Sequence, residues 1–168
     1  MKPTLNLDYE QVRKLVDGAV PFNRHVGVLL TGVGDGWATA ELDLNDEVKN
    51  HLGTMHGAAL YQVAEFAAAI AFVGAFAPFM GQVFFAARKA EIDYPKAARG
   101  RVVANGRLES ELPEIIAEIE RRGHARARAV SSVCDVDGTV VATLRVVLGV
   151  RRVDSGSSAE RAGIEEVR

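Results

Sequence analysis

The chain has 168 residues, of which 48% are hydrophobic, and its 20 basic and 22 acidic side chains leave a net charge of −2. This length and composition can bury a substantial core, and the near-neutral charge gives no reason to expect nucleic acid as a partner. A single cysteine, Cys134, excludes a disulfide within the chain, and its apolar strand context indicates a packed thiol.

Residues 8–19 predict an amphipathic helix, because apolar residues recur at helical spacing and Asp8 stands near its start. Pro21 is expected to end this helix, so residues 1–22 form a predicted N-terminal helical extension. The opening residues, MKPTLNLDYE, include no apolar stretch of the kind found in secretory signals. We therefore expect a cytoplasmic protein.

A strand, a loop and a long helix are predicted next. Residues 36–44 alternate between apolar and polar side chains, as in a half-buried strand. A polar loop over residues 45–55 leads into a helix predicted over residues 58–77, which consists of helix formers and apolar residues. Thr54 or Met55 lies where the cap of that helix is expected.

Glu65 is the one acidic or basic side chain of this apolar helix. A helix of roughly 20 apolar residues could span a bilayer, but a carboxylate near its middle would cost ~2.5–3.5 kcal/mol there. No second span or basic flank supports a membrane protein. We therefore expect no membrane partner, and a helix that is buried by the strands of a globular domain.

The remaining residues predict mostly strands. Residues 113–122 suit either a short helix or a strand extension, and residues 154–168 form a small polar tail that is expected to fray. A tight turn at residues 135–138 predicts a hairpin that closes the sheet. The predicted strands cover residues 82–94, 101–110, 125–134 and 139–153. Together these elements predict a single domain over residues 1–153.

His56 and Gly57 fall at the start of the central helix, where free backbone N–H groups and the positive end of the helix dipole favour negative charge. The N–H of Gly57 is therefore a candidate oxyanion donor. Glu65 follows His56 by nine residues, which corresponds to a rotation of about 180° and a rise of ~13.5 Å. The two ends of this segment cannot meet at one substrate atom. A twofold dimer with antiparallel helices would bring Gly57 of one chain near Glu65 of the other.

These residues follow the pattern N-x-x-G-x-x-H-G with an acid nine residues after the histidine, formed here by Asn50, Gly53, His56, Gly57 and Glu65. The pattern resembles that of the hotdog-fold acyl-CoA thioesterases, in the branch of the phenylacetate-degradation thioesterases and 4-hydroxybenzoyl-CoA thioesterase. The resemblance implies an α+β fold in which a curved antiparallel sheet wraps a long central helix. It also implies homodimers or dimers of dimers that hydrolyse acyl-CoA between subunits, without a cofactor.

The resemblance assigns a role to each residue of the pattern. It implies that the Gly57 N–H polarises the thioester carbonyl and that Glu65 acts as general base or nucleophile. It further implies that Asn50 orients water or substrate and that His56 fixes the loop. Ala69 stands where some relatives carry a hydroxyl one turn after the acid.

Further residues are assigned to substrate binding. Tyr61 and Gln62, one turn before Glu65, are the expected substitutes for the missing hydroxyl. Most basic side chains are expected to cover solvated strand faces. Arg88 and Lys89 are candidates for binding the phosphates of coenzyme A, and His51 is assigned to substrate binding. No metal site is expected, because the histidines show no ligand spacing supported by cysteines or carboxylates.

Alternative hypotheses remain open for these residues. Glu65 could be a buried carboxylate paired with an arginine, and Asn50 could satisfy only loop backbone groups. A hotdog dehydratase or hydratase could use His51 and Glu65, which are fourteen residues apart. A non-catalytic acyl-CoA binding module would keep the fold without the chemistry. The sequence leaves the acyl group undetermined.

Overall fold

The structure is a computed structural model that describes residues 1–5 and 8–153, so the predicted tail over residues 154–168 lies outside the described residues. The helices are α1 (Tyr9–Val16), α2 (Pro21–Val26), α3 (Gly57–Ala75), the 3-10 helix η1 (Ala77–Phe79) and α4 (Leu112–Arg122). The strands are β1 (Leu29–Gly34), β2 (Trp37–Leu42), β3 (Val83–Asp93), β4 (Val102–Leu108), β5 (His124–Asp135) and β6 (Val140–Arg152).

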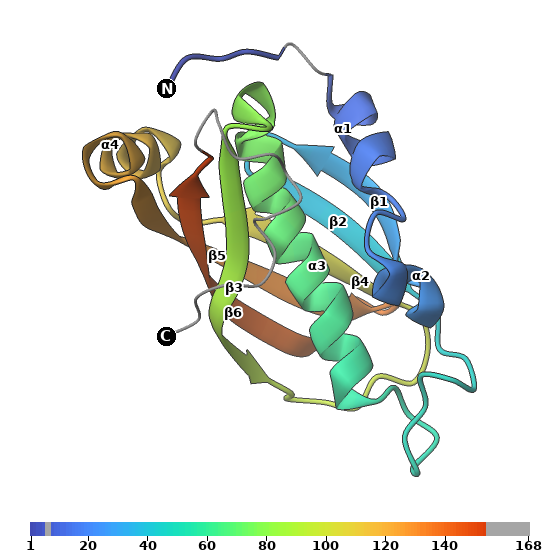
Figure 1. Ribbon diagram of the computed structural model, residues 1–168. Coiled ribbons are helices and arrows are strands. Elements are labelled where there is room, and N and C mark those ends of the chain that lie inside the picture. The colour runs from blue at the N-terminus through green and yellow to red at the C-terminus, as the bar shows by residue number, and fades with distance from the viewer. Residues whose placement is uncertain (6–7, 154–168) are drawn as a thin grey trace.

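Within the described residues, six strands form one sheet in the order β1-β2-β4-β5-β6-β3, and every neighbouring pair is antiparallel. Helix α3 crosses one face of this sheet (Figure 1) and packs on its central strands. The inward residues of β5 and β6 alternate with outward ones, which gives the sheet one apolar face. The predicted α+β arrangement is confirmed.

Helix α3 is rich in alanine, the strongest helix former, and most of its residues are buried. By length and composition it could cross a membrane, but 72% of its most apolar stretch is buried inside the fold. Its small side chains allow the helix to approach the sheet closely. At Gly106 of β4, an added Cβ would overlap the carbonyl oxygen of Ala67 on α3.

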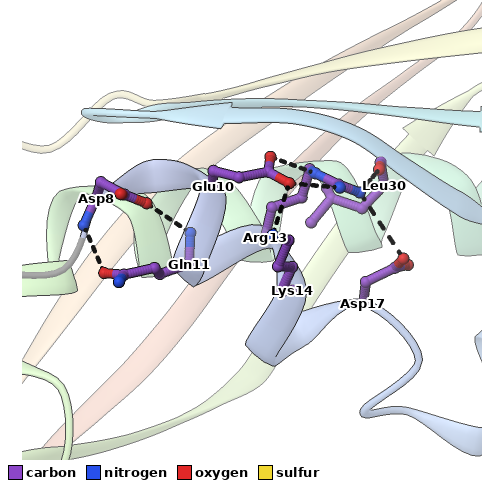
Figure 2. A network of polar contacts seen from close by, with 7 residues as sticks. All are labelled: Asp8, Glu10, Gln11, Arg13, Lys14, Asp17 and Leu30. Carbon is purple, nitrogen blue, oxygen red and sulfur yellow. Dashed lines mark hydrogen bonds and ion pairs between the residues drawn. The ribbon is translucent and has the colours of Figure 1, made fainter.

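The N-terminal extension contains two helices. Asp8 caps α1 through a reciprocal capping box with Gln11, and Arg13 contacts both Glu10 and the carbonyl oxygen of Leu30 on β1 (Figure 2). The hydrogen bond from Arg13 holds the pKa of Glu10 well below its usual range. These contacts tie α1 to the first strand of the sheet.

Several expectations about element boundaries were wrong. Helix α1 ends at Val16, and Pro21 instead begins α2, because proline suits the first turn of a helix. His56 caps α3 in place of Thr54 or Met55. The pattern of residues 29–34 did not predict β1.

The hairpin of β5 and β6 does not close the sheet. Strand β3 pairs with β6 and forms the edge, with a bulge at Arg88. None of the eleven residues of β3 is buried in one chain. A long edge strand with open hydrogen-bonding groups is a ready template for pairing with another chain. Residues 113–122, for which two alternatives were open, lie in helix α4.

We predict that Gly106→Ala destabilises the fold by about 1–3 kcal/mol, because the added methyl group overpacks the contact between β4 and α3. Urea unfolding at matched protein concentration measures this change. Gly100→Ala is the matched control, since a Cβ at Gly100 meets no atom within 4 Å. Equal stability of the two variants would contradict the close packing of α3 on the sheet.

Candidate active site

The loop before α3 is organised by Asn50. Its side-chain amide donates to Thr54 Oγ1 at 2.8 Å and to the Met55 carbonyl at 3.4 Å, and its Oδ1 accepts from the backbone N–H groups of Leu52 and Thr54. All the hydrogen-bonding capacity of the amide group is thus directed at the loop. These bonds favour the loop-forming interpretation of Asn50 within one chain, while a direct role with water stays a prediction.

The first turn of α3 leaves one backbone donor open. Of its first four N–H groups, that of Ala58 donates to His56 Nδ1 at 3.0 Å, and those of Ala59 and Leu60 donate to the His56 carbonyl. Within the described part of the chain, the Gly57 N–H has no acceptor. The positive end of the helix dipole therefore presents a single free donor at Gly57.

Glu65 lies eight residues further along α3 and is half-buried. Burial raises the pKa of its carboxyl, because a low-dielectric environment disfavours the charged form. Across residues 1–5 and 8–153, no side chain forms a hydrogen bond or ion pair with this carboxylate. The alternative of a carboxylate paired with an arginine in the same chain therefore finds no support.

The two candidate substitutes for the missing hydroxyl differ in their surroundings. Gln62 donates to Oδ1 of Asn23, a residue of α2 that is only 3% exposed, so its amide group is already engaged by the N-terminal extension. The pKa of Tyr61 is raised by burial and by the nearby negative charge of Glu65. Tyr61 thus lies near enough to Glu65 for the charge of the carboxylate to raise its pKa.

Sequence reasoning missed Tyr94. It directly follows the edge strand β3, and its hydroxyl donates to the carbonyl oxygen of Gly57 at 3.0 Å. Its pKa is raised by burial and by the proximity of Tyr61. Tyr94 therefore joins Gly57, Tyr61 and Glu65 along one side of α3, although a tyrosine before a proline carries no specific signal in the sequence.

The remaining predicted residues are not brought to this side of α3. On β6, Val146 and Leu148 are buried, whereas Val147, the register partner of Lys89, alternates to the outer face of the sheet. Lys89 forms an ion pair of 2.6 Å with Glu91 there, and the side chain of Arg88 lies against Gly149. His51 is exposed in the loop and makes no side-chain hydrogen bond to any described residue.

An open groove of about 430 Å³ lies beside Tyr94 and is lined by Asp93, Tyr94, Pro95, Thr143 and Arg145. Among the described residues, no group of three histidine, cysteine or acidic side chains gathers where it could hold a metal ion. Along α3 itself, the groups available for chemistry are the half-buried carboxylate of Glu65, the hydroxyls of Tyr61 and Tyr94, and the open backbone N–H of Gly57. These groups suit proton transfer and stabilisation of an oxyanion.

Comparisons with known proteins agree on the fold. A family model described as a domain of unknown function (DUF4442) matches residues 9–150, and no curated protein matches the sequence. A Pseudomonas aeruginosa protein of unknown function, described as a probable thioesterase, has a TM-score of 0.73 and 20% identity over 89% of this chain and 99% of that one.

Two further solved structures are similar. A thioesterase from Haemophilus influenzae has a TM-score of 0.71 and 13% identity over 94% of this chain and 100% of that one. The Escherichia coli PaaI protein from the phenylacetic acid degradation operon has a TM-score of 0.63 and 14% identity over 81% of this chain and 86% of that one. At these identities the likeness establishes the fold, and the predicted hotdog fold is confirmed.

We predict that Glu65→Gln is more stable than the wild type at pH 7 and that this difference disappears towards pH 4. The raised pKa means that the folded state holds the proton more tightly than the unfolded state, whose pKa lies near the ordinary 4.5. Stability is therefore lost as pH rises above 4.5 and through the folded pKa, and it is regained on acidification. Urea unfolding at several pH values measures the effect.

Glu109→Gln controls for the loss of one negative charge, because Glu109 is exposed and forms no side-chain hydrogen bond or ion pair with any described residue. A Glu65→Gln protein that is no more stable than wild type at pH 7 would contradict the unpaired state of this carboxylate. It would indicate that a cation of another subunit neutralises Glu65.

Proposed function

Because the chain belongs to the DUF4442 family and shares the fold of hotdog thioesterases, we propose that it is an acyl-CoA thioesterase. The observation that carries the proposal is the pair of unsatisfied groups on α3. One is the N–H of Gly57, which has no acceptor in the described chain, and the other is the half-buried carboxylate of Glu65, which has no partner there.

In the proposed reaction, the Gly57 N–H donates to the thioester carbonyl oxygen and stabilises the oxyanion that develops on it. In the general-base route, Glu65 takes a proton from water while the water oxygen attacks the carbonyl carbon. The C–S bond then breaks, and the CoA thiolate that leaves takes the proton from Glu65. In the nucleophilic route, the Glu65 carboxylate attacks first, releases CoA and forms a mixed anhydride that water hydrolyses.

The proposal requires two subunits for each site. Gly57 and Glu65 are eight residues apart on a rigid helix, which corresponds to about 12 Å of rise, so one chain cannot direct both groups at one carbonyl. We place the interface at the open edge of β3, where twofold pairing would run α3 antiparallel to its copy. Gly57 of one chain would then complete the site of Glu65 of the partner.

Other predicted residues keep supporting roles in the proposal. Asn50 and His56 hold the loop that presents Gly57, and Tyr61 takes the place of the auxiliary hydroxyl beside Glu65. Arg88 and Lys89 remain proposed contacts for the phosphates of CoA. To reach these side chains, the CoA moiety would extend past the edge of the sheet. His51, Gln62 and the cytoplasmic location remain expectations from the sequence.

We predict that Glu65→Gln loses at least ~10²-fold in turnover, the low end for removal of a general base. A panel of acyl-CoA thioesters, assayed by release of free thiol, identifies the best substrate for the comparison. Glu109→Gln is the control and should retain activity. Wild-type turnover by Glu65→Gln would exclude both routes. If the wild-type protein binds acyl-CoA tightly but hydrolyses none of the thioesters, it is a binding module.

We predict that Gly57→Pro loses on the order of 10²-fold in turnover, because proline removes the N–H that stabilises the oxyanion. Proline suits the first helical position, and the extended backbone of His56 (φ −67°, ψ 141°) suits a residue before proline. Gly57→Ala keeps the N–H and places its Cβ 3.5 Å from Tyr94, an ordinary contact. The alanine variant is therefore the matched control.

The same two variants test the shared site. A purified heterodimer of one Glu65→Gln chain and one Gly57→Pro chain rebuilds one of its two sites, so it should recover about half of wild-type turnover. Each parent homodimer should remain impaired. A heterodimer as inactive as its parents would place both groups of a site in one chain and contradict the composite arrangement.

A further inference from the structure

Tyr94 connects the end of the edge strand to the start of the central helix. Its hydroxyl donates to the Gly57 carbonyl at 3.0 Å. Its ring lies against Gly57, since an added Cβ there would be 3.5 Å from the Tyr94 Cζ. The contact joins two segments that are 37 residues apart in the sequence.

The backbone around Gly57 is held on both sides. The His56 N–H donates to the Val48 carbonyl at 2.8 Å, and the Ala58 N–H donates to His56 Nδ1 at 3.0 Å. Tyr94 adds a bond to the carbonyl of Gly57 itself. These bonds leave the Gly57 N–H as the free group of an otherwise anchored turn.

We propose that Tyr94 is a positioning residue that holds Gly57 so that its free N–H points at the substrate carbonyl. This inference rests on the proposed thioesterase function and adds a residue that the sequence pattern does not contain. Glycine has the widest backbone freedom of any residue, and the first turn of a helix lacks the hydrogen bonds that fix later turns. An external anchor at Gly57 therefore limits the directions that its N–H can take.

The environment of Tyr94 suits this role. A tyrosine hydroxyl is protonated at neutral pH, because its ordinary pKa is near 10, and partial burial and the neighbouring Tyr61 raise the pKa of Tyr94 further. The Tyr94 side chain also lines the open groove of about 430 Å³ together with Asp93, Pro95, Thr143 and Arg145. Replacement by phenylalanine removes only the hydroxyl and keeps that wall, which separates positioning of Gly57 from binding in the groove.

The test is Tyr94→Phe, for which we expect kcat to fall about 10-fold while KM stays near the wild-type value. Loss of an anchor misdirects the donor in the transition state but leaves the groove intact. Tyr9→Phe is the matched control, because Tyr9 lies on α1 and its hydroxyl makes no hydrogen bond to any described residue. Thermal unfolding of both variants checks that the fold is intact.

A double-mutant cycle tests whether Tyr94 acts through Gly57. If it does, Tyr94→Phe should have little effect in a Gly57→Pro background, where the N–H is already absent. Rates are measured at high enzyme concentration, so that slow variants remain measurable. Wild-type kcat in Tyr94→Phe, or a loss of the same factor in both backgrounds, would overturn the inference.

The two proposals fail in different ways. The proposed function fails if wild-type protein releases no thiol from any thioester or if Glu65→Gln keeps full turnover. The inference about Tyr94 fails if Tyr94→Phe keeps wild-type kcat even though the wild-type protein hydrolyses a thioester and Glu65→Gln loses turnover. A drop in stability without a change in kcat would assign Tyr94 to structure alone and also overturn the inference.

Discussion

The close approach of α3 to the sheet is the constraint on which the rest of the structure depends. Alanines on the helix and Gly106 on β4 bring backbone near backbone, so that even one added methyl group would overlap the Ala67 carbonyl. Close-packed protein interiors have low compressibility. This packing fixes the positions of Gly57 at the start of the helix and of Glu65 along it, and the proposed chemistry depends on those two positions.

The site keeps unsatisfied groups that a purely structural core would avoid. Among residues 1–5 and 8–153, half-buried Glu65 has no partner, and the N–H of Gly57 is left open while its three neighbours are bonded. Partial burial of a carboxylate that has no partner costs free energy. Functional sites often sacrifice stability in this way. The surrounding apolar helix supplies that stability, and the same burial makes the carboxylate a stronger base.

Local signals in the sequence predicted local structure. The alanine-rich run predicted α3, and Asp8 with Gln11 fits a capping box whose two residues are three positions apart. Features that depend on distant contacts could not be predicted this way. The bond from Gln62 to Asn23 joins residues 39 apart and that from Tyr94 to Gly57 joins residues 37 apart. His56 as the cap was missed because its capping atom is a ring nitrogen, and caps are usually side-chain oxygens.

The proposed hydrolysis requires that the protein forms a dimer. Gly57 and Glu65 are separated by about 12 Å of helical rise, and α3 is packed closely against the sheet at Gly106. In the proposed mechanism, the second half of each site therefore comes from another chain. The exposed strand β3 offers the edge along which that chain can pair, and Tyr94 at its end reaches the helix terminus. Edge pairing would thus set the position of each oxyanion donor opposite the partner's carboxylate.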